Sequence, residues 1–142
     1  VVVHALKSVS GEFDIVILLQ PTSPFRNSSH IADALKIYAS SEALSLVSIC
    51  ESPKSPYWFF SLEKNGSLVP VLRDKKQFER RQELPKTYVL NGAIYVVDVV
   101  LFLRANKFIF EETVSYLMDV GSSVDIDCLM DFKLAQLMLD EK

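Results

Sequence analysis

Long hydrophobic runs, glycine and cysteine are all scarce in this sequence. Its longest apolar runs, at residues 15–19 and 92–97, fall far short of the roughly 20 apolar residues that cross a bilayer. The first residues lack the basic start and the long apolar core of a secretory signal peptide. We therefore expect a cytoplasmic protein that does not act at a membrane.

The chain also lacks a large charge of either sign, since 15 basic residues and 18 acidic ones give a net charge of −3. A nucleic-acid partner has no electrostatic support, because binding to phosphates depends on clustered lysine and arginine. The two cysteines, Cys50 and Cys128, have neither metal-ligand spacing nor a CxxC arrangement. We expect both to be buried, reduced thiols.

The sequence does contain enough apolar residues for a core. They make up 49% of the 142 residues, which is typical of a globular domain and not of a disordered chain. However, the early apolar residues lead into no glycine-rich or basic loop of the kind that binds phosphates in many α/β domains. Either the phosphates are held elsewhere, or the chain is a piece of a longer protein.

An α/β unit is predicted in the first third of the chain. Residues 14–20, DIVILLQ, form a run of branched apolar side chains, as in a strand buried on both faces of a parallel sheet. Two prolines then end the strand, and Ser28 or Ser29 can cap a helix with apolar residues at helical spacing. A second strand at 43–50 would complete a right-handed βαβ unit.

The rest of the chain alternates in a similar way. Two extended runs around Asn65-Gly66 predict a hairpin. The other predicted elements are the end of a helix at 1–9, a charged loop or short helix at 74–82, strands at 92–97 and 113–118, a short helix at 98–105, an extended segment at 124–127 and a terminal helix at 128–140 with Leu129, Phe132, Gln136 and Leu139 on one stripe. The predicted class is α/β, with a mixed, mainly parallel sheet and helices on both faces.

The first candidate binding residues follow the strand at 14–20, in the segment QPTSPFR. Ligands of open α/β sheets bind beyond the carboxyl ends of strands, and Gln20 stands at such an end. Its amide offers donors and acceptors to a base or a sugar hydroxyl. Ser23 adds a hydroxyl, and Arg26 a contact to an anion. The alternative is a proline-stiffened turn with Arg26 in solvent.

A second group joins Arg81 in RRQELP to Asn91 and Tyr95 in NGAIY. Arg81 presents two parallel donors that suit a phosphate or a carboxylate. Asn91-Gly92 is either a tight turn that leads into a strand or part of a ligand site. Tyr95 either contacts the ligand or packs in the core.

The third group is the pair Asp125 and Asp127 in SVDID. In an extended segment these carboxylates face the same side with their Cα atoms roughly 7 Å apart. They can converge on one Mg²⁺, which takes few carboxylates together with water and phosphate oxygens. The alternative is that Asp127 caps the last helix and Asp125 is solvated. Phe108 and Ile109 form an apolar loop cluster, for which core packing is the default.

In order and spacing, three segments resemble the acylneuraminate (CMP-sialic acid) cytidylyltransferases: LLQPTSPFR, RRQELP followed by NGAIYV, and SVDID before a terminal amphipathic helix. The resemblance runs from about Ile15 to Gln136. It implies one domain over residues 1–142 with a Rossmann-like nucleotidyltransferase fold and a Mg²⁺-dependent reaction. In that reaction the anomeric hydroxyl of a nine-carbon acid sugar attacks the α-phosphate of CTP, giving a CMP-sugar and pyrophosphate.

The resemblance also implies roles for individual residues. Gln20 and Ser23 would contact the acid sugar or the nucleotide, and Arg81 would act in catalysis near phosphate or the sugar. Asn91 and Tyr95 would line the sugar pocket. Two further pairs would be an apolar wall facing an N-acyl group, Phe108 with Ile109, and the catalytic metal ligands, Asp125 with Asp127.

Two departures from the family pattern affect these expectations. The N-terminal strand and the basic, glycine-rich loop that grips the triphosphate are absent, so we expect a truncated chain with little CMP-sugar synthesis of its own. Trp58 stands near a position where some members carry lysine, which makes legionaminate-type sugars as consistent as N-acetylneuraminate. Homodimerisation is expected through residues 53–84, with Tyr57, Trp58 and Phe59 as anchors.

Two other functions stay open. One is a CMP-KDO-type or other sugar nucleotidyltransferase, against which the RRQxLP and NGAIY segments argue. The other is a non-catalytic binding or dimerisation module, which the missing triphosphate loop favours. A substrate panel tests the first, and the upstream reading frame tests the second.

Overall fold

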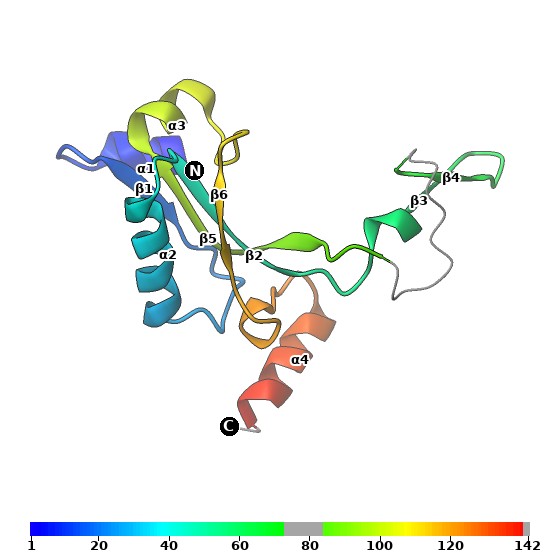
Figure 1. Ribbon diagram of the computed structural model, residues 1–142. Coiled ribbons are helices and arrows are strands. Elements are labelled where there is room, and N and C mark those ends of the chain that lie inside the picture. Colours follow the sequence, from blue (N-terminus) through cyan, green and yellow to red (C-terminus); the bar gives the residue numbers. More distant parts are fainter. Residues whose placement is uncertain (73–83, 141–142) are drawn as a thin grey trace. The chain divides into compact units, whose positions relative to one another are not determined.

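The fold was determined as a computed structural model, which describes residues 1–72 and 84–140 (Figure 1). Two compact units are present, residues 1–50 together with 90–142, and residues 51–89. Arg81 and the charged segment predicted at 74–82 lie outside the described residues, as does part of the proposed dimerisation segment 53–84. Among the helices that are described, none is both long and apolar enough to cross a membrane.

A four-stranded sheet is the centre of the first unit. The strands are β1 (Ile15–Leu18), β5 (Tyr88–Asp98), β2 (Ser45–Glu51) and β6 (Val114–Leu117), in the order β1-β5-β2-β6. β5 is antiparallel to β1, whereas β6 is parallel to β2. β5 is also antiparallel to β2. Leu44 is hydrogen-bonded to Asp98 and Ser48 to Ile94, so the residue numbers rise along one strand while they fall along the other. Three strands therefore share one direction, and the predicted mixed α/β sheet is confirmed.

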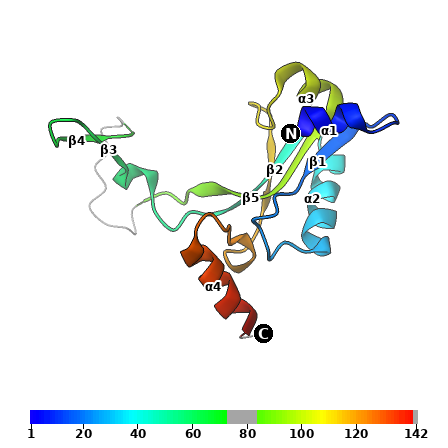
Figure 2. The ribbon, with the colours of Figure 1, turned by 180° about the vertical axis from the view of Figure 1, so that it is seen from behind.

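Helices cover both faces of this sheet. Helix α2 (Ser28–Ser40) is nearer the viewer in Figure 1, and α1 (Val2–Ser8) is nearer in the reverse view of Figure 2. Two more helices, α3 (Val99–Ala105) and α4 (Leu129–Asp140), follow β5 and β6. The core lies between the sheet and α2, and its buried members are Ala34, Leu46, Ala93, Ile94, Val96 and Met118.

The strands differ in how deeply they are buried. The first four residues of β2 are all buried, as expected for a central strand covered on both faces. No residue of β1 is fully buried, and Ile17 is 36% exposed. The prediction that β1 is buried on both faces is therefore wrong, because within the described sheet β1 is an edge strand.

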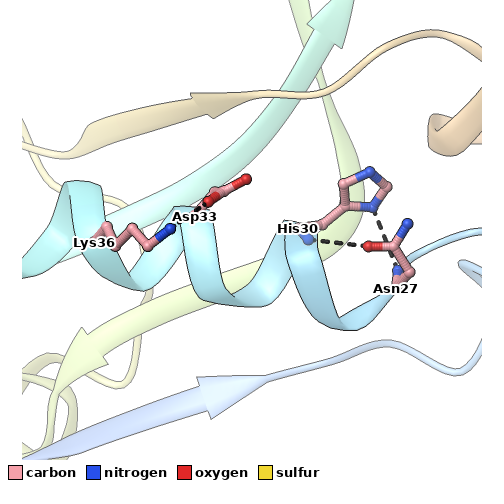
Figure 3. A network of polar contacts seen from close by, with 4 residues as sticks. All are labelled: Asn27, His30, Asp33 and Lys36. Atoms are coloured by element: carbon pink, nitrogen blue, oxygen red, sulfur yellow. Dashed lines mark hydrogen bonds and ion pairs between the residues drawn. The ribbon is translucent and has the colours of Figure 1, made fainter.

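Helix α2 begins at Ser28, and its N-cap is the residue before the two serines that were expected to cap it. Asn27 is the N-cap, and its Oδ1 accepts a hydrogen bond of 3.1 Å from the backbone N of His30. In return, His30 Nδ1 accepts one of 3.3 Å from the backbone N of Asn27, as Figure 3 shows. This reciprocal capping box satisfies two backbone donors that the first turn of a helix leaves unpaired.

Replacing Asn27 by Ala is expected to lower the free energy of unfolding by about 1 kcal/mol, because the side-chain acceptor for His30 N is lost. Ser28→Ala is the matched control, and we expect it to change stability by less than about 0.5 kcal/mol. Urea denaturation of both variants measures the difference. Equal decreases in the free energy of unfolding for the two variants would contradict the capping role of Asn27.

The C-terminal part agrees with the expectations only in part. The segment 124–127, expected to be extended, contains no regular strand: Val124 has extended backbone angles and Asp127 lies in a bend. In α4 only Ala135 is buried, while Leu129, Phe132 and Leu139 of the predicted stripe are about half or more exposed. Cys50 is buried as expected, but Cys128 is exposed at the start of α4.

The second unit contains the predicted hairpin. Strands β3 (Phe60–Leu62) and β4 (Leu68–Pro70) pair antiparallel. Gly66 adopts a φ of +86° in the connecting turn, and the Asn65 side chain accepts a hydrogen bond from Ser67 N. The residues before the hairpin form a short 3-10 helix, Pro56–Trp58. Asn and Gly therefore act here as turn residues, as the sequence predicted.

Candidate active site

The guanidinium of Arg26 joins the end of β1 to β5. Its Nη1 donates two hydrogen bonds of 2.9 Å, one to the carbonyl oxygen of Gln20 and one to that of Ala93. Arg26 thus lies neither free in solvent nor simply facing an anion, the two roles considered from the sequence. It fixes the backbone from which Gln20 projects.

The side chains of Gln20 and Asp125 meet over Gly92. Gly92 lies within β5 with a φ of +73°, a conformation that favours glycine. A Cβ on Gly92 would lie 2.5 Å from Gln20 Oε1 and 3.3 Å from Asp125 Oδ2. Two residues about a hundred positions apart in the sequence are therefore brought together above a glycine. Asn91-Gly92 is part of the strand, so the interpretation of this pair as a tight turn before it is wrong.

The segment that carries Asp125 is tied to the loop after β1. The backbone N of Ile126 donates a 2.9 Å hydrogen bond to the carbonyl oxygen of Thr22. Two side-chain atoms in these segments, Ser23 Oγ and Asp125 Oδ1, are buried and have no hydrogen-bond partner among the described residues. Buried polar atoms are normally paired. These two unsatisfied atoms make the segments that carry Ser23 and Asp125 candidates for contact with a ligand.

Tyr95 contributes a hydroxyl and an aromatic wall near the same carboxylate. It lies opposite Leu18 in the β1–β5 pairing, and its ring centroid is 5.5 Å from that of Phe108. Burial, followed by the charge of Asp125, raises the pKa of Tyr95 above its ordinary value. Tyr95 therefore stays protonated at neutral pH and can donate a hydrogen bond.

The two residues of the expected apolar wall differ in their surroundings. Phe108 is half-buried and packs against Phe102 at a centroid distance of 4.8 Å, as well as against Tyr95. Ile109 is 45% exposed. Phe108 therefore has a packing role that its neighbour does not share.

Asn91 is only 4% exposed, and its side chain is occupied within the protein. Its Oδ1 accepts hydrogen bonds from Ser48 Oγ at 2.6 Å and from Ala93 N at 3.3 Å. Its Nδ2 donates to Ser123 Oγ at 2.9 Å and lies 3.3 Å from Met118 Sδ. This network joins β2, β5 and the segment after β6. The Asn91 side chain therefore stabilises the strands that carry the site and is not itself free to bind a ligand.

The second acidic residue of the pair, Asp127, is exposed. It does not provide the cap for α4. Instead, the Asp131 carboxylate accepts hydrogen bonds from the backbone N of Asp127 and of Cys128, at 3.1 and 2.8 Å. A hydrogen bond from the Cys128 side chain, followed by these two backbone bonds, lowers the pKa of Asp131. The helix start is thus satisfied without Asp127, and its carboxylate remains a candidate metal ligand.

Metal binding here would rest on two carboxylates. Across residues 1–72 and 84–140, no group of three His, Cys, Asp or Glu side chains is arranged to hold a metal ion. Mg²⁺ is commonly held by one or two carboxylates, with water and substrate phosphates completing its coordination. Asp125, with one buried and unpaired oxygen, fits this pattern.

The structure brings together most of the residues predicted from the sequence. One region contains Gln20, Tyr95, Phe108 and Asp125. The buried Ser23 lies in the loop that is hydrogen-bonded to the Asp125 segment. Asn91 does not point to this region but forms hydrogen bonds within the protein. The sequence did not predict the roles of Arg26 and Gly92. A glycine inside a strand pattern is a known sign of close approach by another group, and this sign was available at Gly92.

No family model matches the chain. Among curated proteins, it is 35% identical over 140 residues to the N-acylneuraminate cytidylyltransferase of Escherichia coli O18:K1:H7, covering 98% of this chain and 33% of that protein. It is 31% identical over 131 residues to the CMP-N,N'-diacetyllegionaminic acid synthase of Legionella pneumophila, covering 90% of this chain and 55% of that protein. The chain thus spans about a third to about half of these relatives.

A solved structure shares the fold. The 4-diphosphocytidyl-2C-methyl-D-erythritol synthase of Anaerococcus prevotii superposes with a TM-score of 0.63 and 10% sequence identity. The match covers 98% of this chain and 64% of that one. The predicted nucleotidyltransferase-type α/β fold is therefore confirmed, and at this identity the likeness concerns the fold alone.

Proposed function

Because the chain resembles part of the N-acylneuraminate cytidylyltransferases along nearly its whole length, we propose that it forms the acid-sugar half of a cytidylyltransferase site. In the proposed cytoplasmic reaction, the anomeric oxygen of a nine-carbon acid sugar attacks the α-phosphorus of CTP. The bond to the β-phosphate oxygen breaks, the hydroxyl loses its proton, and pyrophosphate leaves. The observation that carries this proposal is the placement of Gln20 and Asp125 over Gly92, with Tyr95 within the influence of the Asp125 charge. Two buried polar atoms nearby, Ser23 Oγ and Asp125 Oδ1, have no hydrogen-bond partner among the described residues.

The residues of this site have chemically distinct roles in the proposal. The Gln20 amide and the Tyr95 hydroxyl orient the sugar through hydrogen bonds, and Ser23 supplies a further hydroxyl. Phe108, with Ile109 beside it, offers an apolar surface to an N-acyl group. Arg81 is proposed to bind phosphate or the sugar carboxylate, while Asn91 holds the pocket in place. Phosphoryl transfer depends mainly on such positioning and on charge neutralisation.

Asp125 and Asp127 are the proposed ligands of Mg²⁺. These carboxylates would hold the ion, which would supply neutralisation of the negative charge on the phosphate oxygens. One oxygen of Asp125 is buried and has no hydrogen-bond partner among the described residues, whereas Asp127 is exposed.

The sugar substrate is proposed to be a sialic-acid-type acid, of the N-acetylneuraminate or the legionaminate class. Relatives named for both sugars match this chain. The test is turnover by the product of the complete reading frame, with CTP, Mg²⁺ and a panel of N-acetylneuraminate, N,N'-diacetyllegionaminate and KDO. Use of either nine-carbon acid supports the proposal. Preference for KDO would move the protein to another class of sugar nucleotidyltransferase, and no turnover would favour a binding module.

We also propose that the second unit mediates homodimerisation. Its large apolar side chains are exposed, including Trp58 at 44%, Phe59 at 45%, Phe60 at 50% and Leu62 at 73%. Exposed apolar patches of this kind are typical of protein–protein interfaces. A second copy of the chain would cover them.

The double variant Phe59→Ser with Phe60→Ser is therefore expected to shift the protein from dimer toward monomer, because two anchors lose their apolar area. Sedimentation velocity over a range of concentrations measures this shift. The matched control is Leu103→Ser, an exposed apolar residue of α3 in the other unit, which should leave the assembly unchanged. An unchanged protein that is already monomeric at high concentration would contradict the dimer.

A further inference from the structure

We propose that Arg26 and Gly92 are positioning residues that fix the Gln20 amide beside Asp125 and thereby set selectivity for the acid sugar. This inference rests on the proposed function for its consequence, but its structural part can be tested independently. Neither residue is proposed to touch the substrate. Both act through the backbone and side chain of Gln20.

Arg26 holds the backbone on both sides of the Gln20–Gly92 contact. One hydrogen bond from its Nη1 reaches the carbonyl of Gln20 itself, and the other reaches the carbonyl of Ala93, the residue after Gly92. Both bonds are partly buried, where a charged donor to a carbonyl is stronger than it is in water. Arg26 directly precedes Asn27, the cap of α2, so the helix start anchors the segment that carries the guanidinium.

Gly92 leaves the space that the Gln20 side chain occupies. At 2.5 Å from Gln20 Oε1, a Cβ on residue 92 would overlap that oxygen. The amide would have to move away from residue 92, and so leave its place near Asp125 Oδ2, which lies 3.3 Å from the same point. The lack of a side chain at Gly92 therefore allows the Gln20 amide to lie directly against the backbone of β5.

Gly66 provides a matched comparison for this argument. It also has a positive φ, +86°, but nothing lies within 4 Å of a Cβ added there. An alanine at either position meets the same kind of backbone strain. Only at residue 92 does it also collide with a side chain, so the difference between the two variants isolates the displacement of Gln20.

An amide that is held in one orientation presents its oxygen and its NH₂ group to defined partners. A sugar hydroxyl, carboxylate or N-acyl group that matches this arrangement binds, and one that does not leaves a polar group unpaired. An amide that can rotate by 180° would exchange its oxygen and its NH₂ group, and so would bind a sugar group that offers a donor as well as one that offers an acceptor. Loss of Arg26 or Gly92 is therefore expected to reduce discrimination among acid sugars as well as the rate.

The structural test uses the side-chain NH₂ signals of Gln20 in ¹H–¹⁵N NMR spectra of the chain, assigned by their loss in Gln20→Ala. Gly92→Ala and Arg26→Lys should both shift these signals, whereas Gly66→Ala should leave them in place. If Gly92→Ala folds poorly, the double variant Gln20→Ala with Gly92→Ala should regain stability, because the colliding side chain has been removed. Unchanged Gln20 signals in a folded Gly92→Ala variant, or no recovery in the double variant, would overturn the inference.

The functional test uses the product of the complete reading frame. Gly92→Ala is expected to lower kcat/KM for the sugar about 10-fold to 100-fold, with the KM for CTP nearly unchanged. Adding Gly92→Ala to Gln20→Ala should cost little more, since the two changes remove the same contact. Full additivity would overturn the positioning role. If the unchanged protein made no CMP-sugar at all, the proposed function would fail, and the NMR result would still decide the placement of Gln20.

Discussion

The Asp125→Asn variant of the product of the complete reading frame is expected to form CMP-sugar at least about 100-fold more slowly than the unchanged protein. The substitution keeps the shape of the side chain but removes the charge that is proposed to hold Mg²⁺. The fold should survive, since Asp125 Oδ1 has no hydrogen-bond partner among the described residues that the change would break. Steady-state rates at limiting and at saturating Mg²⁺ measure the effect.

Asp127→Asn should slow CMP-sugar formation to a similar extent, because it also removes a carboxylate that is proposed to hold Mg²⁺. The helix start should stay intact, since the Asp131 carboxylate accepts the hydrogen bonds there. The control is Asp33→Asn, an exposed carboxylate whose surface ion pair with Lys36 contributes little. Near-normal rates in both Asp125→Asn and Asp127→Asn at limiting Mg²⁺ would remove the metal role from this pair.

Asn91→Ala is expected to lower the free energy of unfolding by about 2 to 4 kcal/mol. The change removes four polar contacts of a buried side chain and leaves Ser48 Oγ without its acceptor on Asn91. The hydroxyl would keep its bonds to the backbone of Ile94, so the sheet should weaken without falling apart. Urea denaturation measures the loss.

The matched control for Asn91→Ala is Asn65→Ala, which removes one exposed hydrogen bond at the tip of the hairpin. It should cost less than about 1 kcal/mol. If Asn91→Ala instead left stability unchanged and weakened only sugar use, Asn91 would be a direct ligand, as the family resemblance implies. A loss of stability together with weaker sugar use would fit its place behind the pocket.

Much of the fold could be predicted from patterns that are local in the sequence. Apolar runs identified β1, β2, β5 and β6, and the Asn65-Gly66 turn identified the hairpin. Features that depend on neighbours were missed. The burial of β1 was overestimated because an apolar run does not show whether a strand lies at an edge.

The candidate site could also be predicted only in part, because some of its features are local in the sequence and others depend on neighbouring strands. Residue types at strand ends pointed to Gln20 and Asp125, and the structure brings these two together. The sequence could not show that Asn91 turns inward or that Arg26 binds two carbonyls, because both facts depend on groups from other strands. Such long-range hydrogen bonds have no signature in spacing alone.

The central claim is that this site joins an acid sugar to CMP. It is tested most directly by ³¹P NMR of the product of the complete reading frame incubated with CTP, Mg²⁺ and N-acetylneuraminate or N,N'-diacetyllegionaminate. The proposed function predicts a new phosphodiester signal and pyrophosphate in equal amounts, both greatly reduced in Asp125→Asn. Unchanged CTP with both sugars, or formation of CDP and inorganic phosphate without a CMP-sugar, would contradict it.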